Sequence, residues 1–298
     1  MSWFWLKMIA LLAMTVDHVG LVFGWQGWDL LPIDSAWLRT VGRISFPLFA
    51  FCVAQGWKHT RNRARYFRNL IWGAAVSQIP FTLAFYGPNF RPEAQTTFVF
   101  QLQLWYLPAA VAAAGLYWYY ALHGRRGLDW IPAAVAALLP ALRLQVGGTW
   151  ILCEKGNVLY TFLTALFCLF VVERWSDSRT GERATLLVAV LLLLMTYGLH
   201  GDYGSCLVGV ALILGFALLE TRRQQAAFLA AWSAVYYGLL LVSWINALAS
   251  ALAGVCILLY DPDAPSRLRA KKIFYWYYPC HLLILGFVNG FLRWITLR

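Results

Sequence analysis

Long apolar segments recur along the whole chain and restrict its fold more than any other feature. Only 12% of the 298 residues are charged, whereas soluble domains carry about 25%. Because a bilayer offers no water to backbone polar groups, such segments cross it as helices. The sequence therefore predicts an all-α polytopic membrane protein, a bundle of about 11 transmembrane helices in a single domain, 1–298. The candidate spans are 3–24, 37–57, 67–86, 98–122, 130–146, 151–172, 184–199, 203–219, 226–242, 244–260 and 272–294.

The basic residues lie mainly in alternate loops, which predicts the orientation in the membrane. Most loop Lys and Arg residues fall in 58–68, 123–129, 173–183, 220–225 and 261–272. Cytoplasmic loops are the ones enriched in Lys and Arg. We therefore expect a cytoplasmic N-terminus and a periplasmic C-terminus.

The same distribution limits the partners of the protein. The formal net charge of +11 is concentrated in these short loops, so we expect contact with membrane lipids and no nucleic-acid partner. The six cysteines show neither a CxxC pattern nor the spacing of metal ligands. We therefore expect no metal and interpret the cysteines as packing residues.

Asp17 and His18 are adjacent ionisable residues near the end of the first apolar segment. Ionisable groups inside a membrane are costly and mark a functional site by default. Neighbouring residues on a helix project about 100° apart, so the two side chains are expected to have different partners. We expect Asp17 to pair with Arg43, which lies deeper than the outward-reaching Arg39. A purely structural ion pair is the alternative.

Lys7 and His281 extend this set. Lys7 precedes His18 by three helical turns, so both lie on one stripe of the first helix. Lys7 either marks the inner mouth of a path to His18 or only reaches the cytoplasmic headgroups. His281 lies near the middle of the last segment, behind an aromatic run at 275–278. The candidate acid–base site consists of Asp17, His18, Arg43 and His281.

A dense basic stretch at 58–68 contains Lys58, His59, Arg61 and Arg65. This stretch holds more positive charge than is needed to set the orientation of the protein in the membrane. Such a cluster fits anionic lipid headgroups or the phosphates of a cofactor. Orientation in the membrane is the alternative explanation.

Polar residues at the outer ends of other segments are candidates for substrate contact or support. Gln78 comes shortly before Pro80, and Asn157 lies near the start of the sixth segment. Asp202 and Tyr203 occupy a tight turn whose glycines permit close backbone approach. A role in the turn itself is the usual one for such an aspartate.

Residues 7–20 and 42–51 form two specific sequence blocks, KMIALLAMTVDHVG and GRISFPLFAF. Both resemble motifs of the TraX family, membrane proteins associated with the N-terminal acetylation of conjugative pilin. Shorter similarities span almost the whole remaining chain, at Gly56, 59–61, 77–81, 157–161, 202–204 and 278–283. The resemblance implies a multi-pass protein of the bacterial inner membrane.

The resemblance also implies an enzyme that moves an acetyl group from cytoplasmic acetyl-CoA to an acceptor at the periplasmic face. The implied acceptor is the N-terminus of a pilin or another envelope protein. In this hypothesis His18 is the general base, Asp17 tunes the site, and Arg43 or His281 donates to the oxyanion. An acetyl-histidine intermediate at His18 is an open variant. The residues expected to meet the CoA phosphates are Lys7, Lys58, His59, Arg61 and Arg65.

Two other functions are compatible with buried charges. A proton-coupled transporter would use Asp17 and His18 as a relay. Transporters of this kind often contain two related halves, and none is evident in this sequence, which favours the enzyme. In a non-catalytic assembly protein or lipid-binding protein, the same charges would be structural.

Overall fold

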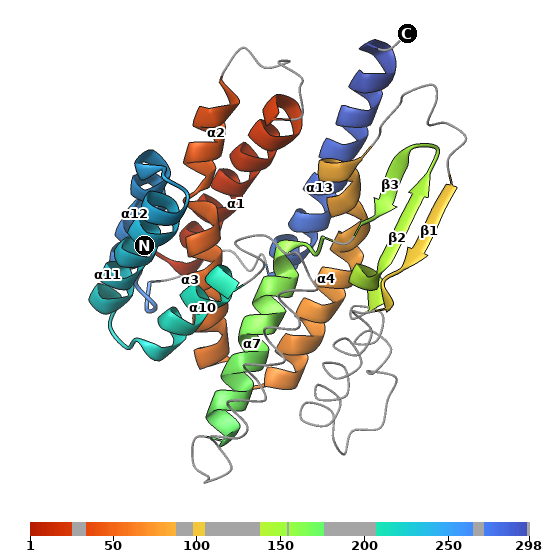
Figure 1. The fold of residues 1–298 in the computed structure, drawn as a ribbon. Helices are drawn as coiled ribbons and strands as arrows, with labels where there is room; N and C mark the ends of the chain where they lie inside the picture. The colour runs from red at the N-terminus through yellow and green to blue at the C-terminus, as the bar shows by residue number, and fades with distance from the viewer. Residues whose placement is uncertain are drawn as a thin grey trace. The chain divides into compact units, whose positions relative to one another are not determined.

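The computed structural model is mostly helical in the residues that it describes, which are 1–25, 34–87, 98–104, 138–153, 155–175, 207–264 and 271–296 (Figure 1). The chain forms two compact units. The first comprises Met1–Lys58 and Leu212–His281, and the second comprises His59–Ala211 and Leu282–Arg298. Each unit is therefore built from segments that are far apart in the sequence.

The described part of the first unit is built from helices. Local signals explain several of their ends, such as the reciprocal capping box of Thr221 and Gln224 at the start of α11. The elements are α1 (Trp3–Gly20) with the π-helical η1 (Leu21–Trp25), α2 (Ser35–Gly42), α3 (Ser45–His59), most of α10 (Leu207–Leu218), α11 (Arg222–Ser233) with the π-helical η5 (Ala234–Leu240), α12 (Trp244–Leu259), and α13 (Lys271–Thr296) as far as His281.

Small residues bring α2 close to α1 in this unit. A Cβ atom added to Gly20 would lie 2.7 Å from the Cβ of Leu38, so the two helices touch backbone to side chain at this point. Deeper in the unit, the ring of Phe51 meets Phe216 edge to face at a centroid distance of 5.7 Å. The close approach of α2 places its side chains beside the end of α1 that carries Asp17.

The second predicted span, 37–57, is interrupted in the structure. Helix α2 ends at Gly42 and α3 begins at Ser45, so Arg43 and Ile44 form a short turn between them. The N–H of Arg43 donates to Thr40 O at 3.1 Å in a tightened last turn. Arg43 therefore belongs to neither helix.

The second unit combines helices with a small sheet. Its elements are α4 (Arg63–Tyr86), β1 (Phe98–Leu102), η4 (Leu139–Ala141), β2 (Leu142–Val146), β3 (Thr149–Leu152), α7 (Val158–Trp175) and the rest of α13. Helix α4 contacts α7 and β3. Gly286 of α13 packs on the backbone of α4, where an added Cβ would lie 3.2 Å from Ala84 N.

The three-stranded antiparallel sheet corrects the prediction of an all-α protein. Its order is β1-β2-β3, with Phe98 opposite Val146 and Leu102 opposite Leu142. The sheet takes the start of the predicted helix 98–122, the end of 130–146 and the first residues of 151–172. The physical reason is the turn at Gly147 and Gly148, whose φ angles of 57° and 77° suit the hairpin between β2 and β3.

The remaining helix predictions agree with the structure wherever it describes the chain, within a few residues at each end. Two of the described helical stretches are long and apolar enough to cross a membrane, namely Trp3–Gly24 and, with its turn at 43–44 included, Ser35–His59. Shorter apolar helices lie at Val158–Phe170, Leu207–Leu218 and Trp244–Leu259. The predicted span 184–199 lies outside the described residues. The count of about eleven spans and the orientation stay predictions.

Candidate active site

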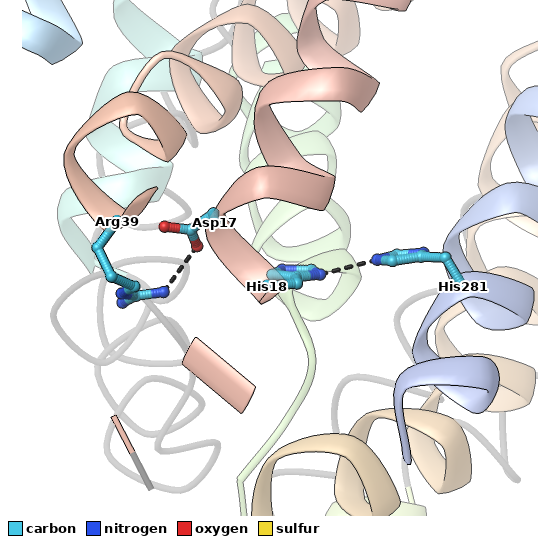
Figure 2. Close-up of polar contacts among 4 residues, drawn as sticks. All are labelled: Asp17, His18, Arg39 and His281. Atoms are coloured by element: carbon cyan, nitrogen blue, oxygen red, sulfur yellow. Dashed lines mark hydrogen bonds and ion pairs between the residues drawn. The ribbon is translucent and has the colours of Figure 1, made fainter. Parts of the chain in front are cut away.

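Asp17 and His18 lie in the last turn of α1, immediately before η1, and they face different neighbours (Figure 2). Asp17 points to Arg39 of α2, whereas His18 points to His281 of α13. The expectation of separate partners is therefore confirmed. Segments with π-helical hydrogen bonds occur frequently at functional sites, and here one directly follows the two ionisable side chains.

The ion-pair partner of Asp17 is Arg39, whereas the sequence favoured Arg43, whose charge also acts on the Asp17 carboxylate. Arg39 Nη1 lies 2.7 Å from Asp17 Oδ2, and the two side chains are only 20% and 12% exposed. Gly42 makes room for the carboxylate, because a Cβ added there would lie 2.2 Å from Asp17 Cβ. The ion pair therefore depends on a close backbone contact as well as on charge.

Arg43 lies in the turn between α2 and α3, outside both helices. A continuous helix would place Arg39 and Arg43 on one face, four residues apart. In the structure the guanidinium of Arg43 instead lies over the ring of Tyr237, 5.3 Å from its centroid. Tyr237 belongs to the π-helical η5 and is 1% exposed. The site therefore includes a cation–π contact that the sequence did not predict.

His18 and His281 form a hydrogen-bonded pair within the first unit, and their nearly parallel rings meet edge to edge (Figure 2). His18 Nδ1 lies 2.8 Å from His281 Nε2, and the ring centroids are 5.0 Å apart with an interplanar angle of 7°. His281 Nδ1 lies 2.9 Å from the backbone carbonyl oxygen of Tyr277. The ring of Tyr277 also stacks on His281 at 5.1 Å. The three rings form a continuous cluster between α1 and α13.

A second contact between the same two helices joins hydroxyl groups. Thr15 Oγ1 lies 2.6 Å from the phenolic oxygen of Tyr277, and it donates to the carbonyl oxygen of Leu11 at 2.9 Å. Thr15 precedes His18 by three residues and Tyr277 precedes His281 by four. Residues at these spacings share a helix face, so the spacing was a signal that could have identified both as neighbours of the histidines.

The basic residues expected to meet CoA divide into two groups. In the first unit, Lys7 Nζ lies over the rings of Trp3 and Phe274, at 5.0 and 5.1 Å. Lys58 Nζ donates to the carbonyl oxygen of Leu219 at 2.8 Å. Both ammonium groups therefore have contacts inside the protein.

In the second unit, His59, Arg61 and Arg65 are exposed, and their side chains make no hydrogen bond or ion pair within the described part of the chain. The neighbouring Arg63 instead pairs with Glu173 of α7. The backbone N–H of Arg65 donates to Asn62 Oδ1, which caps α4. The stretch from the end of α3 to the first turn of α4 therefore presents three basic side chains to its surroundings.

Gln78 and Asn157 meet in the second unit, where both are fully buried. Asn157 Nδ2 donates to Gln78 Oε1 and to the carbonyl oxygen of Ala74, each at 2.9 Å. Gln78 Nε2 donates to the carbonyl oxygen of Lys155 at 2.7 Å. Because these groups satisfy one another, the pair supports the junction of α4 and α7. Asp202 and Tyr203 lie outside the described residues.

Comparisons with known proteins agree over nearly the full length of the chain. The family described as TraX protein matches residues 3–147 and 130–289. The probable fimbrial assembly protein FimC, serogroup H1, of Dichelobacter nodosus is 26% identical, over 98% of this chain and 97% of its own length. Protein TraX of Escherichia coli is 24% identical, over 94% of this chain and 84% of its own length. No solved structure matches.

Proposed function

The chain belongs to the TraX family, and on this premise we propose that it is a membrane-embedded acetyltransferase that modifies a pilin or a related envelope protein. The acetyl donor is cytoplasmic acetyl-CoA, and the acceptor is the N-terminal amine at the periplasmic face of the inner membrane. FimC, the relative from Dichelobacter nodosus, is a probable fimbrial assembly protein, which supports a fibre subunit as the acceptor.

The observation that carries the proposal is the His18–His281 pair. A thioester is already activated, so acetyl transfer mainly needs a base for the attacking amine. His18 is partly exposed and hydrogen-bonded to a second imidazole at 2.8 Å. The amine nitrogen bonds to the acetyl carbon, the carbon–sulfur bond breaks, and sulfur leaves as the thiol of CoA. His18 takes the proton released by the amine and then delivers it to the leaving sulfur, which completes the thiol.

Charged residues near the end of α1 support this chemistry. The Asp17–Arg39 ion pair fixes the last turn of α1 against α2, and thereby fixes the backbone of His18. Arg43 is the proposed donor to the negative charge that develops on the acetyl oxygen. The contact with Tyr237 holds its guanidinium in one place, and a preorganised donor costs little reorganisation during the reaction.

The exposed basic stretch is proposed to bind the phosphates of CoA. His59, Arg61 and Arg65 are exposed, and guanidinium groups bind phosphate oxygens through paired hydrogen bonds. Lys7 and Lys58 contribute positive charge, although both also have contacts inside the protein. The double variant Arg61→Glu/Arg65→Glu should raise the KM for acetyl-CoA at least tenfold and leave kcat nearly unchanged. An unchanged KM would remove this stretch from the donor site.

The central experiment measures acetyl transfer in membranes that contain the full chain. Isotopically labelled acetyl-CoA and a pilin with a free N-terminal amine are supplied, and mass spectrometry detects the acetylated N-terminus. His18→Ala should lower the rate by about 100-fold or more, the lower range of general-base effects. His123→Ala, the same substitution in the predicted loop 123–129, is the matched control and should retain the rate.

Two results would reject the proposal. Unchanged transfer in a folded His18→Ala protein would remove His18 from the mechanism. Solute uptake driven by a pH gradient in liposomes without CoA, together with no acetyl transfer, would instead identify a proton-coupled transporter. The Asp17 and His18 pair would then act as a proton relay.

A further inference from the structure

The contacts between α1 and α13 determine where the protons of the two histidines lie. The carbonyl oxygen of Tyr277 can only accept a hydrogen bond, so His281 Nδ1, 2.9 Å away, must carry a proton. In a neutral imidazole the other nitrogen is then an acceptor. His281 Nε2 therefore accepts from His18 Nδ1 at 2.8 Å. By the same rule, the basic lone pair of neutral His18 lies on Nε2.

The hydroxyl contact can be assigned in the same way. The single hydroxyl proton of Thr15 is donated to the carbonyl oxygen of Leu11. In the 2.6 Å contact between the two hydroxyl groups, the phenol of Tyr277 is therefore the donor and Thr15 is the acceptor. Tyr277 is held at both ends, through its hydroxyl group on α1 and through its carbonyl oxygen on the ring of His281.

We propose that His281 is a positioning residue that fixes the tautomer and orientation of His18, and that Tyr277 and Thr15 hold His281 in place for this purpose. This inference rests on the proposed acetyl transfer, in which His18 is the general base. A second group that orients a catalytic histidine through Nδ1 leaves Nε2 to exchange protons with the substrate. Here a neutral imidazole takes the orienting position.

The assignment replaces one of the roles expected from the sequence. His281 was a candidate donor to the oxyanion, but its two ring nitrogens already bond to His18 and to the carbonyl oxygen of Tyr277. When His18 takes a proton on Nε2, its Nδ1–H bond to His281 becomes a charge-assisted hydrogen bond and strengthens. His281 therefore stabilises the protonated base, and Arg43 is left as the candidate donor to the oxyanion.

The tautomers can be measured without any acetyl transfer. Nitrogen-15 NMR of the full chain in lipid bilayers, with His59, His123 and His200 replaced by Gln, observes only His18 and His281. In the neutral state both rings should carry their proton on Nδ1, with a coupling across the hydrogen bond from His18 Nδ1 to His281 Nε2. A proton on Nε2 of either neutral ring would overturn the proposal.

Kinetics then test the positioning role. His281→Leu removes the acceptor and should lower kcat at least tenfold, with less than a twofold change in either KM. His281→Gln offers a carbonyl oxygen in place of Nε2 and should recover part of the rate. Equal rates for the wild type, the Leu variant and the Gln variant would overturn the positioning role, even if the tautomers are as assigned.

Milder variants keep the test decisive if His281→Leu does not fold. Tyr277→Phe and Thr15→Val remove the two partners of one hydrogen bond, so each should lower kcat by a similar factor and the double variant by no more than either. Thr164→Val is the matched control, because Thr164 also donates to a carbonyl oxygen four residues earlier, in the second unit. Additive losses would overturn the shared role.

The result also separates the two proposals. Acetyl transfer in the wild type that is insensitive to these variants rejects only the positioning role. No acetyl transfer in the wild type rejects the proposed function and the positioning role that rests on it. In that case the NMR measurement still decides whether the hydrogen bonds are assigned correctly.

Discussion

Gly42 lies directly against the side chain of Asp17, and this contact gives a sharp prediction at the scale of single residues. A Cβ at position 42 would lie 2.2 Å from Asp17 Cβ and 2.4 Å from Asp17 Oδ1. Gly42→Ala must therefore displace the carboxylate from Arg39. Overpacking of this kind costs about 1 to 3 kcal/mol. We expect a lower midpoint of thermal unfolding in detergent and a lower rate of acetyl transfer.

Gly254→Ala is the control for this prediction. The nearest atom to a Cβ at position 254 is Ala226 Cβ at 3.5 Å, which is an ordinary van der Waals contact. Gly254 lies within α12, where alanine is favoured over glycine by up to about 1 kcal/mol. The control should be as stable as the wild type or more stable. Equal losses in both variants would show that the contact with Asp17 has no special effect.

Helix geometry made part of the site predictable at this scale. The divergence of Asp17 and His18 follows from their adjacency on a helix, and the structure confirms it. The sequence favoured Arg43 because of its depth, since Arg39 was expected to reach outward. The structure instead turns Arg39 to Asp17 and interrupts the helix at position 43. The break is a property of the folded chain that the sequence pattern did not predict.

The connection between η5 and α12 contains a strained residue, which gives a prediction at the scale of elements. Val242 has a φ angle of 50°, a left-handed conformation that costs a β-branched residue roughly 1 to 2 kcal/mol. Its side chain is 81% exposed, so few contacts hold it. Val242→Gly should stabilise the protein by about 1 kcal/mol, measured as a higher midpoint of thermal unfolding.

Val255→Gly provides the contrast, because this valine is also exposed, at 51%, but lies inside α12. Glycine within a helix lowers stability, so the midpoint should fall. If Val242→Gly also lowers the midpoint, the positive φ does not cost the folded protein free energy. The pair separates backbone strain from the loss of a valine side chain.

Elements were predictable from the sequence where the apolar pattern was continuous, and less so where it alternated. The last predicted helix, 272–294, corresponds to α13 at Lys271–Thr296. In β2, however, apolar and polar residues alternate with a period of two, which is typical of a strand. The prediction of helix 130–146 relied on apolar content alone. The two glycines after β2 were the signal for a hairpin.

At the scale of the whole molecule, the chain order explains why the histidine pair was not identified as a contact. The first unit combines the first 58 residues with residues 212–281. His18 and His281 are 263 positions apart and still lie within hydrogen-bond distance. No local pattern encodes such a contact, because apolar helices of similar composition can pack in many orders. The sequence identified both residues by their chemistry but did not predict their hydrogen bond.

The number of membrane crossings is the property of the whole molecule that the sheet affects most. The predicted span 130–146 loses residues 139–141 to η4 and 142–146 to β2. A helix of the remaining nine residues would be only about 14 Å long at 1.5 Å per residue. A bilayer core is about 30 Å thick. If fewer than about eleven segments cross the membrane, 130–146 is therefore the first candidate for a segment that does not cross.

The side of the membrane on which the C-terminus lies tests this count, because each crossing reverses the side. The alternation of basic loops predicts about eleven crossings and a cytoplasmic N-terminus. With eleven crossings, an odd number, the C-terminus lies in the periplasm. An epitope tag after Arg298 should therefore bind antibody on intact spheroplasts, and a tag after Gly127 should bind only after permeabilisation. A C-terminal tag that stays protected means an even number of crossings. A tag between Gly147 and Gly148 on the same side as the tag after Gly127 would then identify 130–146 as the segment that does not cross.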